Sequence, residues 1–200
     1  IHVVWESGRG GTLGTVSDPT TVMYAVSYNR GETWSQPLTI TNETSERARN
    51  ITIGQDGAGN IVMAWWGLPE DLVYYQVSAD NGLSWSKPAQ IPNVWGVWFV
   101  YTSRLDTYSM ATDSAGYLHL VMVGRTAAAE TTMRLLHLIW DGSTWSFPEA
   151  IVSYQGDAPE WPRVAVSNGN QLNVVWFVRG EDFIWSAGGE AYKVWYSSKK

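Results

Sequence analysis

The sequence predicts an all-β protein built from repeated four-stranded antiparallel units. Two observations carry this prediction: a short apolar strand pattern occurs four times, and a turn motif that ends in Trp occurs three times, in phase with it. No stretch of useful length shows the 3.6-residue apolar period of an amphipathic helix. Four-strand units that recur about every 50–60 residues are typical of the blades of a β-propeller.

The strand pattern is an apolar run of five residues. Its copies start 60, 57 and 54 residues apart and are Ile1–Trp5, Ile61–Trp65, Leu118–Met122 and Leu172–Trp176. Three of the copies follow a turn that contains Asp or Asn and Gly, and each of those turns follows another short strand: Ile51–Ile53, Tyr108–Ala111 and Val164–Val166. One repeat therefore consists of strands A and B joined by this turn, a variable loop, strand C, the Trp-containing turn and strand D.

The Trp-containing turn keeps the order Gly-x-Ser/Thr-Trp-Ser-x-Pro-x-x-Ile in all of its copies. The residues that define it are Ser27, Asn29, Gly31, Thr33 and Trp34 in the first copy, Ser78, Asp80, Gly82, Ser84 and Trp85 in the second, and Asp141, Gly142, Thr144 and Trp145 in the third. The Asp or Asn side chain can hydrogen-bond its own turn, and Gly accepts a positive φ angle. We expect the Trp to begin strand D and the Pro to restrict strand D to the edge of its sheet.

This motif resembles the Asp-box, or bacterial neuraminidase repeat, of the sialidase-like β-propellers. The resemblance covers essentially the whole chain, although Asn29 replaces Asp in the first box and Leu138 and Trp140 stand at the Ser and Asp positions of the third. In that family the boxes are structural corners on the face away from the active site. The resemblance therefore assigns the box residues, including Trp34, Trp85 and Trp145, to turns and core.

All 200 residues are expected to form one propeller segment, with blade remnants at 1–40, 41–91, 92–151 and 152–200. The chain opens at a strand B and stops at a strand C, which makes 14 expected strands, or three and a half blades. Because an open propeller leaves strand edges unprotected, two arrangements are expected. The chain is a segment of a longer propeller, or two copies join their half-blades into a closed seven-bladed ring as a homodimer.

Composition excludes several classes of function. The net charge of −6 argues against a nucleic-acid partner, and no apolar run is long enough for a membrane span. Cysteine is absent, which excludes disulfides and thiol chemistry. His2, His119 and His137 lie within expected strands without metal-ligand spacing, so we expect neither a metal nor another cofactor. The 13 Trp and 10 Tyr residues suit both sheet cores and sugar-binding surfaces.

The resemblance places the ligand face at the D-to-A and B-to-C loops, opposite the boxes. Loops on a rigid scaffold are where binding residues collect, and the expected D-to-A loops are 41–50, 92–107 and 152–162. The B-to-C loops add Asp71, Arg125 and Glu130 as polar candidates. The glycan-binding candidates are Trp95, Trp98, Tyr101, Arg104, Asp106 and Trp161.

The resemblance also implies a set of catalytic groups: arginines that hold a substrate carboxylate, a Tyr nucleophile activated by Glu, and an Asp acid/base. The Phe/Tyr-Arg-Ile-Pro motif that marks the first catalytic arginine in the family is missing, and the remaining candidates are Arg49, Arg104, Asp106, Arg163 and Glu160. We therefore expect a secreted or cell-surface propeller that binds a carbohydrate or protein ligand, with catalysis unproven. The alternative is an exo-glycosidase of the sialidase type.

Overall fold

The computed structural model describes residues 1–8, 20–40, 47–97, 108–154, 158–179 and 193–199. These residues contain fourteen strands and no helix, which confirms the all-β prediction. Accordingly, no described segment is a helix that could span a membrane.

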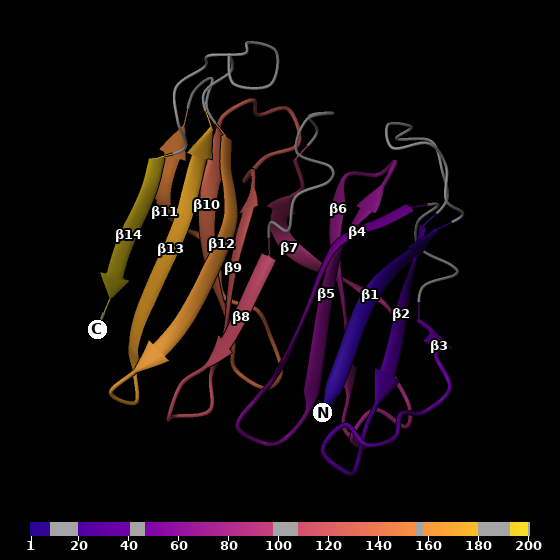
Figure 1. Ribbon diagram of the computed structural model, residues 1–200. Coiled ribbons are helices and arrows are strands. Elements are labelled where there is room, and N and C mark those ends of the chain that lie inside the picture. The colour runs from indigo at the N-terminus through magenta and orange to yellow at the C-terminus, as the bar shows by residue number, and fades with distance from the viewer. Residues whose placement is uncertain (9–19, 41–46, 98–107, 155–157, 180–192, 200) are drawn as a thin grey trace.

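The strands pair in chain order and form four units, which we number from the N-terminus (Figure 1). Unit 1 contains β1 (His2–Gly8), β2 (Thr20–Val26) and β3 (Leu38–Thr39), and unit 2 contains β4 (Arg47–Gln55), β5 (Ile61–Leu68), β6 (Leu72–Ser78) and β7 (Ala89–Trp95). Unit 3 contains β8 (Tyr108–Thr112), β9 (Leu118–Gly124), β10 (Met133–Trp140) and β11 (Glu149–Tyr154), and unit 4 contains β12 (Ala158–Ser167), β13 (Gln171–Arg179) and β14 (Lys193–Lys199). A single parallel pair, Thr20 with Arg47, joins units 1 and 2 into one sheet.

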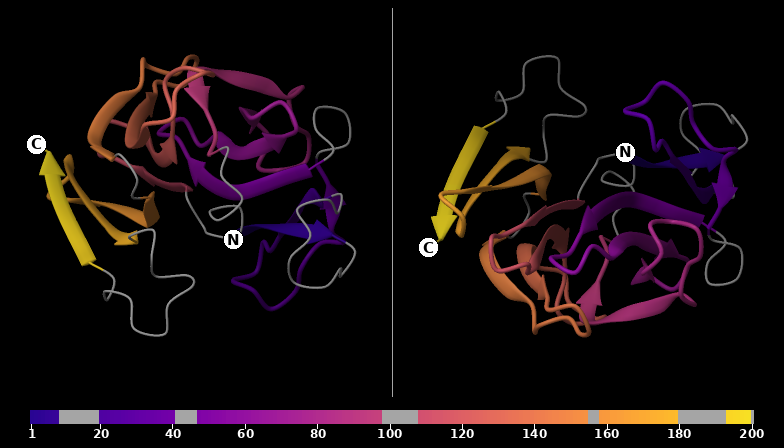
Figure 2. Two further views of the ribbon diagram at one scale, coloured as in Figure 1. Left: turned by 90° about the horizontal axis from the view of Figure 1, so that it is seen from above. Right: turned by 90° about the horizontal axis from the view of Figure 1, so that it is seen from below.

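Viewed along the strands, the units fan out as an open arc with units 1 and 4 at its two ends (Figure 2). The first strands of units 2, 3 and 4 lie on the inside of this arc, where β4 packs beside β8 and β8 beside β12. Between the described strands the sheets do not close into a ring. The inner strands β4, β8 and β12 therefore line the inside of the arc side by side.

The cores lie between successive units. Met63 and Trp65 of β5 belong to the cluster shared with unit 1, whereas Val62, Ala64 and Trp66 belong to the larger cluster shared with unit 3. Neighbouring residues of a strand point to opposite faces, so β5 is buried on both faces. This double burial explains why the repeated strand is a continuous apolar run and does not alternate with polar residues.

The box turns form the hydrogen bonds that their sequence predicts. In the second box, Ser78 Oγ donates to Asp80 (2.8 Å) and accepts from the backbone N–H of Gly82 (2.8 Å). The first box repeats this pattern, with the N–H of Gly31 donating to Ser27 Oγ (2.8 Å). The three box glycines, Gly31, Gly82 and Gly142, all have positive φ. The expectation that these turns lie on the face away from a ligand site stays a prediction.

Two expectations about the boxes need correction. Strand D begins after the Pro and not at the Trp: β3 starts at Leu38, β7 at Ala89 and β11 at Glu149. These three strands do lie at sheet edges, as the prolines predict. The core assignment is wrong for Trp34, which is 45% exposed, whereas Trp85 is half-buried and Trp145 is buried. Trp85 and Trp145 each lie edge-on to a Tyr of the preceding unit, whereas no unit precedes unit 1 among the described residues.

Candidate ligand-binding site

The inner strands β4 and β12 carry the same irregularity at the same position. The pairing of β4 with β5 slips between Arg49 and Thr52, and that of β12 with β13 slips between Glu160 and Arg163. Within each slip one non-glycine residue has positive φ, Asn50 at 57° and Trp161 at 46°. A β-bulge redirects side chains and is common beside active sites, and a positive φ in such residues is a conformation often found at functional sites. These two bulges therefore mark the candidate site.

The bulges also correct the expected loops. Arg49, Glu160, Trp161 and Arg163 lie in strands β4 and β12, and Trp95 is the last residue of β7. The sequence places most of these residues in D-to-A loops because Pro, Asn and charged side chains interrupt the strand pattern there. In the structure the strand forms a bulge at these residues, and its pairing with the next strand continues on both sides of the bulge.

Arg49 and Asn50 are held by a carboxylate from the neighbouring unit. Glu6 of β1 accepts a hydrogen bond from the backbone N–H of Asn50 and another from Arg49 Nη1 (3.5 Å). Both ion-pair side chains retain partial exposure, so solvent screens their attraction. Two donors at this position, Arg49 Nε and Asn50 Nδ2, are buried and have no hydrogen-bond partner among the described residues.

Unsatisfied buried donors are rare in folded proteins because each loses its hydrogen bonds to water. At this bulge two of them belong to successive residues, Arg49 and Asn50. A hydroxyl or carboxylate oxygen of a ligand would satisfy them. Buried donors without a partner occur elsewhere in the described residues, for example Trp65 Nε1 and Trp85 Nε1, but only here do they belong to two successive residues.

The corresponding position of β12 holds a carboxylate and an indole. Glu160 is fully buried, and Trp161 lies edge-on to Phe177 with ring centroids 5.7 Å apart. Arg163 is exposed, and its Nη1 donates to the carbonyl of Pro162 (2.9 Å). Arg49 and Glu160 match in register, since Arg49 is opposite Trp66 and Glu160 is opposite Phe177, but β8 lies between their strands. The structure thus brings Arg49 to Glu6 and leaves Glu160 on a separate inner strand.

The expected aromatic loop, residues 92–107, is described by the structure only over residues 92–97. Trp98, Tyr101, Arg104 and Asp106 lie outside the described residues. Trp95 is half-buried, and its backbone exchanges two hydrogen bonds of 3.0 Å with Arg125. A glycan-binding role for this segment stays a prediction.

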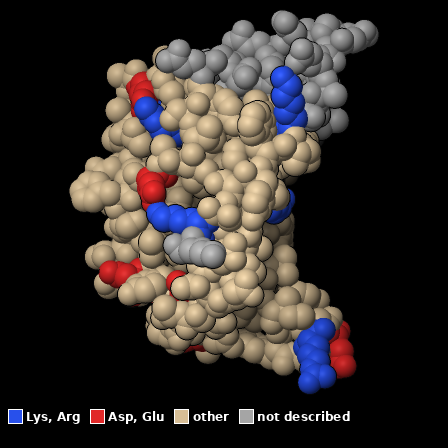
Figure 3. Space-filling view, turned by 90° about the vertical axis from the view of Figure 1, so that its left-hand side faces the viewer, with Lys and Arg blue, Asp and Glu red and all other residues tan. Residues whose placement is uncertain are grey.

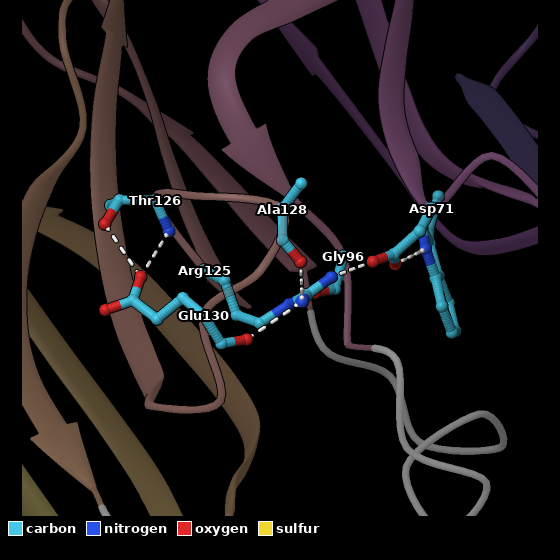
Figure 4. Close-up of polar contacts among 7 residues, drawn as sticks. Asp71, Gly96, Arg125, Thr126, Ala128 and Glu130 are labelled. Atoms are coloured by element: carbon cyan, nitrogen blue, oxygen red, sulfur yellow. Dashed lines mark hydrogen bonds and ion pairs between the residues drawn. The ribbon is translucent and has the colours of Figure 1, made fainter.

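Asp71 and Arg125 are not available to a ligand. They form a buried ion pair between units 2 and 3, with only 4% and 3% of each residue exposed (Figure 4). The other Asp71 oxygen accepts from Trp66 Nε1 (2.8 Å), and Arg125 Nε donates to the carbonyl of Gly96 (3.0 Å). The expectation that these loop residues line the ligand face is therefore wrong.

The remaining nitrogen of the Arg125 guanidinium, Nη1, holds the loop of residues 126–130 by hydrogen bonds. Nη1 donates to the carbonyls of Ala128 (2.7 Å) and Glu130 (2.9 Å), while the Glu130 carboxylate accepts from Thr126 N (3.1 Å) and Oγ1 (3.0 Å). Burial lowers the pKa of Arg125, and hydrogen bonding from Arg134 lowers the pKa of Glu130. Asp71 and Arg125 are 54 residues apart, so no local signal in the sequence reveals their pairing.

The histidines pack against polar neighbours. His119 Nδ1 lies 2.9 Å from His137 Nε2, and the two rings stack at 5.2 Å. His2 Nδ1 lies 2.7 Å from the Tyr24 hydroxyl. Over the described part of the chain, no group of three or more His, Cys, Asp or Glu side chains is arranged to hold a metal ion.

No protein-family model and no curated protein matches this chain. Among solved structures, a Hadza microbial sialidase has 13% identity and a TM-score of 0.64 over 98% of this chain and 42% of its own. The α-L-arabinanase of Penicillium chrysogenum, complexed with arabinobiose, has 14% identity and a TM-score of 0.58 over 98% of this chain and 62% of its own.

A protein of unknown function from Dyadobacter fermentans is also similar, with 16% identity and a TM-score of 0.61 over 90% of this chain and 59% of its own. The shared feature is the fold. This chain has the all-β architecture of β-propeller glycosidases such as these sialidase and arabinanase structures. It spans about two fifths to three fifths of the length of these three proteins.

Proposed function

We propose that this chain is part of a glycan-binding β-propeller whose ligand lies at the bulged ends of the inner strands. The observation that carries the proposal is the pair of buried, unpartnered donors on Arg49 and Asn50. Units 1 to 4 are then the four expected blade remnants of a secreted or cell-surface protein. Catalysis is not part of the proposal.

Three features support a sugar as the ligand. A guanidinium donates charge-assisted hydrogen bonds to carboxylate and hydroxyl oxygens, and Arg49 has one such donor, its Nε, without a partner among the described residues. Trp161 adds an aromatic surface of the kind that stacks on sugar rings. The fold is shared with structures named as a sialidase and an arabinanase, both of which act on sugars.

Sequence spacing suggests an equivalent position on β8, the inner strand between β4 and β12. Thr52, Ser109 and Arg163 occupy matching register positions, opposite Ala64, Val121 and Val175. Asp106 precedes Ser109 by three residues, as Arg49 precedes Thr52 and Glu160 precedes Arg163. We infer that each inner strand supplies one ionisable side chain, and that Trp95, Trp98, Tyr101 and Arg104 complete the site.

The test is a calorimetric titration with an acidic sugar, sialyllactose, and two neutral ones, lactose and arabinobiose. We expect Arg49→Ala to weaken sialyllactose binding at least about tenfold, because a charge-assisted hydrogen bond is lost. Glu6→Gln should strengthen it, because the competing carboxylate charge is removed while an acceptor oxygen remains. Lys87→Ala, on an exposed residue of the second box segment, is the control.

Two results would overturn the proposal: no sugar binds at concentrations up to about 10 mM, or Arg49→Ala behaves like Lys87→Ala. The same mixtures, analysed for released monosaccharide, test the exo-glycosidase alternative. Binding without release would support the lectin-like function, and release that disappears in Arg49→Ala would make this site catalytic.

A further inference from the structure

Unit 1 holds the backbone of the β4 bulge on both sides of Arg49. Thr20, the first residue of β2, donates a hydrogen bond of 2.7 Å from its Oγ1 to the carbonyl of Ala48. On the other side of Arg49, the backbone N–H of Asn50 donates to the Glu6 carboxylate. The two peptide groups that flank Arg49 are therefore each bound by a side chain of the neighbouring unit.

Glu6 and Thr20 reach β4 from one face of the unit 1 sheet. Glu6 is opposite Val22 in the pairing of β1 with β2, and Thr20 precedes Val22 by two residues. Opposite residues of paired strands, and residues two apart along a strand, point to the same face. The backbone of Thr20 also forms the parallel pair with Arg47. Strand register thus brings both side chains to the start of β4.

The hydrogen bond of Thr20 lies in a buried environment. Thr20 is 6% exposed, and Ala48 is fully buried in the apolar cluster between units 1 and 2. Removal of the Thr20 hydroxyl is costly there, because water does not replace a donor lost to a buried carbonyl. Asn50 has a φ of 57°, and such a conformation persists in a non-glycine residue only where the surroundings hold it. Loss of this hydroxyl should therefore let the bulge relax.

We propose that Thr20 is a positioning residue of the ligand site. Its hydroxyl, together with the Glu6 carboxylate, keeps Arg49 and Asn50 in the bulged conformation that presents their unpartnered donors. The inference rests on the proposed function, which assigns these donors to the ligand. It adds that two units build the site, since unit 2 supplies the donors and unit 1 sets their geometry.

A shift of the bulge by one residue turns neighbouring side chains to the opposite face of the strand. A variant without the Thr20 hydroxyl should consequently bind the ligand more weakly, although it retains both donors. This separation of the donors from the residue that positions them makes the proposal testable.

The experiment compares Thr20→Val with Thr20→Ser and Thr112→Val in the 200-residue chain. Valine has nearly the shape of threonine but lacks the hydroxyl, whereas serine keeps the hydroxyl. Thr112 is the matched control, because its hydroxyl also donates to a carbonyl of β4, that of Gln55 at the opposite end of the strand from the bulge. Circular dichroism verifies that each variant is folded.

Amide hydrogen exchange, followed by NMR, measures the bulge without any ligand. We expect Thr20→Val to raise the exchange rate of the Asn50 amide at least about tenfold, because local opening breaks the hydrogen bond that protects it. Thr20→Ser should restore the protection, and Thr112→Val should leave it as in the wild type. A general loss of stability would raise exchange in β5 as well, whereas loss of this hydrogen bond acts beside the bulge.

Calorimetric titration with sialyllactose measures the consequence for binding. We expect Thr20→Val to weaken binding by about three- to tenfold, the effect of one lost hydrogen bond, and Thr20→Ser to restore it. On the side of the molecule that carries β14, Lys and Arg side chains are scattered, and several lie beside Asp or Glu (Figure 3), as Lys199 does beside Glu149. We therefore expect no second site for an acidic sugar on the described surface of that side.

The two measurements separate this inference from the proposed function. A wild type that binds no sugar would overturn the proposed function, while exchange of the Asn50 amide would still decide whether Thr20 holds the bulge. Unchanged exchange in Thr20→Val, or equal effects of Thr20→Val and Thr112→Val, would overturn the positioning role. Faster exchange with an unchanged affinity for sialyllactose would overturn it too, since the ligand would then not depend on the conformation that Thr20 maintains.

Discussion

At the scale of single residues, the ion pair of Asp71 and Arg125 shows how a charged group becomes structural. Every arm of the Arg125 guanidinium meets a protein acceptor, and Asp71 satisfies both Arg125 and the Trp66 indole. A buried charge of this kind is tolerated only while its partner remains. The pair therefore fixes the contact between units 2 and 3 and is closed to ligands.

We expect Asp71→Asn to lower the free energy of unfolding by about 3–5 kcal/mol, because it leaves the Arg125 charge buried without a counter-charge. Urea denaturation measures this loss. The control is Asp80→Asn in the exposed second box, where little change is expected because Asn29 stands at that position in the first box. Equal effects of the two substitutions would show that the ion pair does not hold the units together.

We expect His137 to make the stability of the fold depend on pH. Burial, and then the neighbouring His119, lower the pKa of His137 from 6.5 to about 4. Below about pH 6.5 the unfolded chain binds a proton that the folded chain refuses, so stability is lost as the pH falls from about 6.5 to about 4. We expect a loss of roughly 1–3 kcal/mol across this window.

Thermal or urea unfolding between pH 7 and pH 4 measures the effect, with His137→Gln as the comparison. Glutamine keeps a hydrogen-bonding group but does not titrate, so the slope should flatten in this variant. An unchanged slope would assign the pH dependence to other groups.

At the scale of elements, the box turns show why glycine is required at one position for two separate reasons. Gly31 and Gly82 have φ of 93° and 88°, a conformation that strains any residue with a Cβ atom. At Gly82 a Cβ atom would also lie 1.8 Å from the Tyr24 hydroxyl, whereas at Gly31 the nearest atom is 3.7 Å away. The turn of unit 2 is therefore fitted onto unit 1, and the turn of unit 1 is open on that side.

Substitution of these two glycines distinguishes the cost of backbone strain from the cost of a steric clash, because both have positive φ and only Gly82 contacts Tyr24. We expect Gly31→Ala to cost about 1–2 kcal/mol from the positive φ alone, and Gly82→Ala to cost a further 1–3 kcal/mol, roughly, from overpacking against Tyr24. Urea denaturation of the two variants measures the difference. Equal losses would mean that Tyr24 moves aside without cost.

At the scale of the whole molecule, the described units form an open arc in which apolar clusters fill the contacts between successive units. The strands β4 and β12, which carry the two bulges, both pack beside β8 on the inner side of this arc. The proposed ligand site thus depends on the repetition of the inner strand in units 2 and 4.

The sequence by itself determined the strand classes, their antiparallel order and the box turns. These features depend on interactions within a few residues: the period of two in a strand, the hydrogen bonds of Ser78 and Asp80, and the positive φ of Gly82. Proline likewise placed β3, β7 and β11 at sheet edges because it removes a backbone donor.

Only the tertiary structure decided which polar and aromatic residues face a ligand, a neighbouring unit or solvent. Trp34, Trp85 and Trp145 share one motif, yet their burial differs because a Tyr of the preceding unit packs on Trp85 and on Trp145, and no such contact is made by Trp34 among the described residues. Asp71 and Arg125 resemble loop residues in the sequence and are joined only when units 2 and 3 pack. Such contacts depend on how the units are arranged around the axis, which no local pattern of residues encodes.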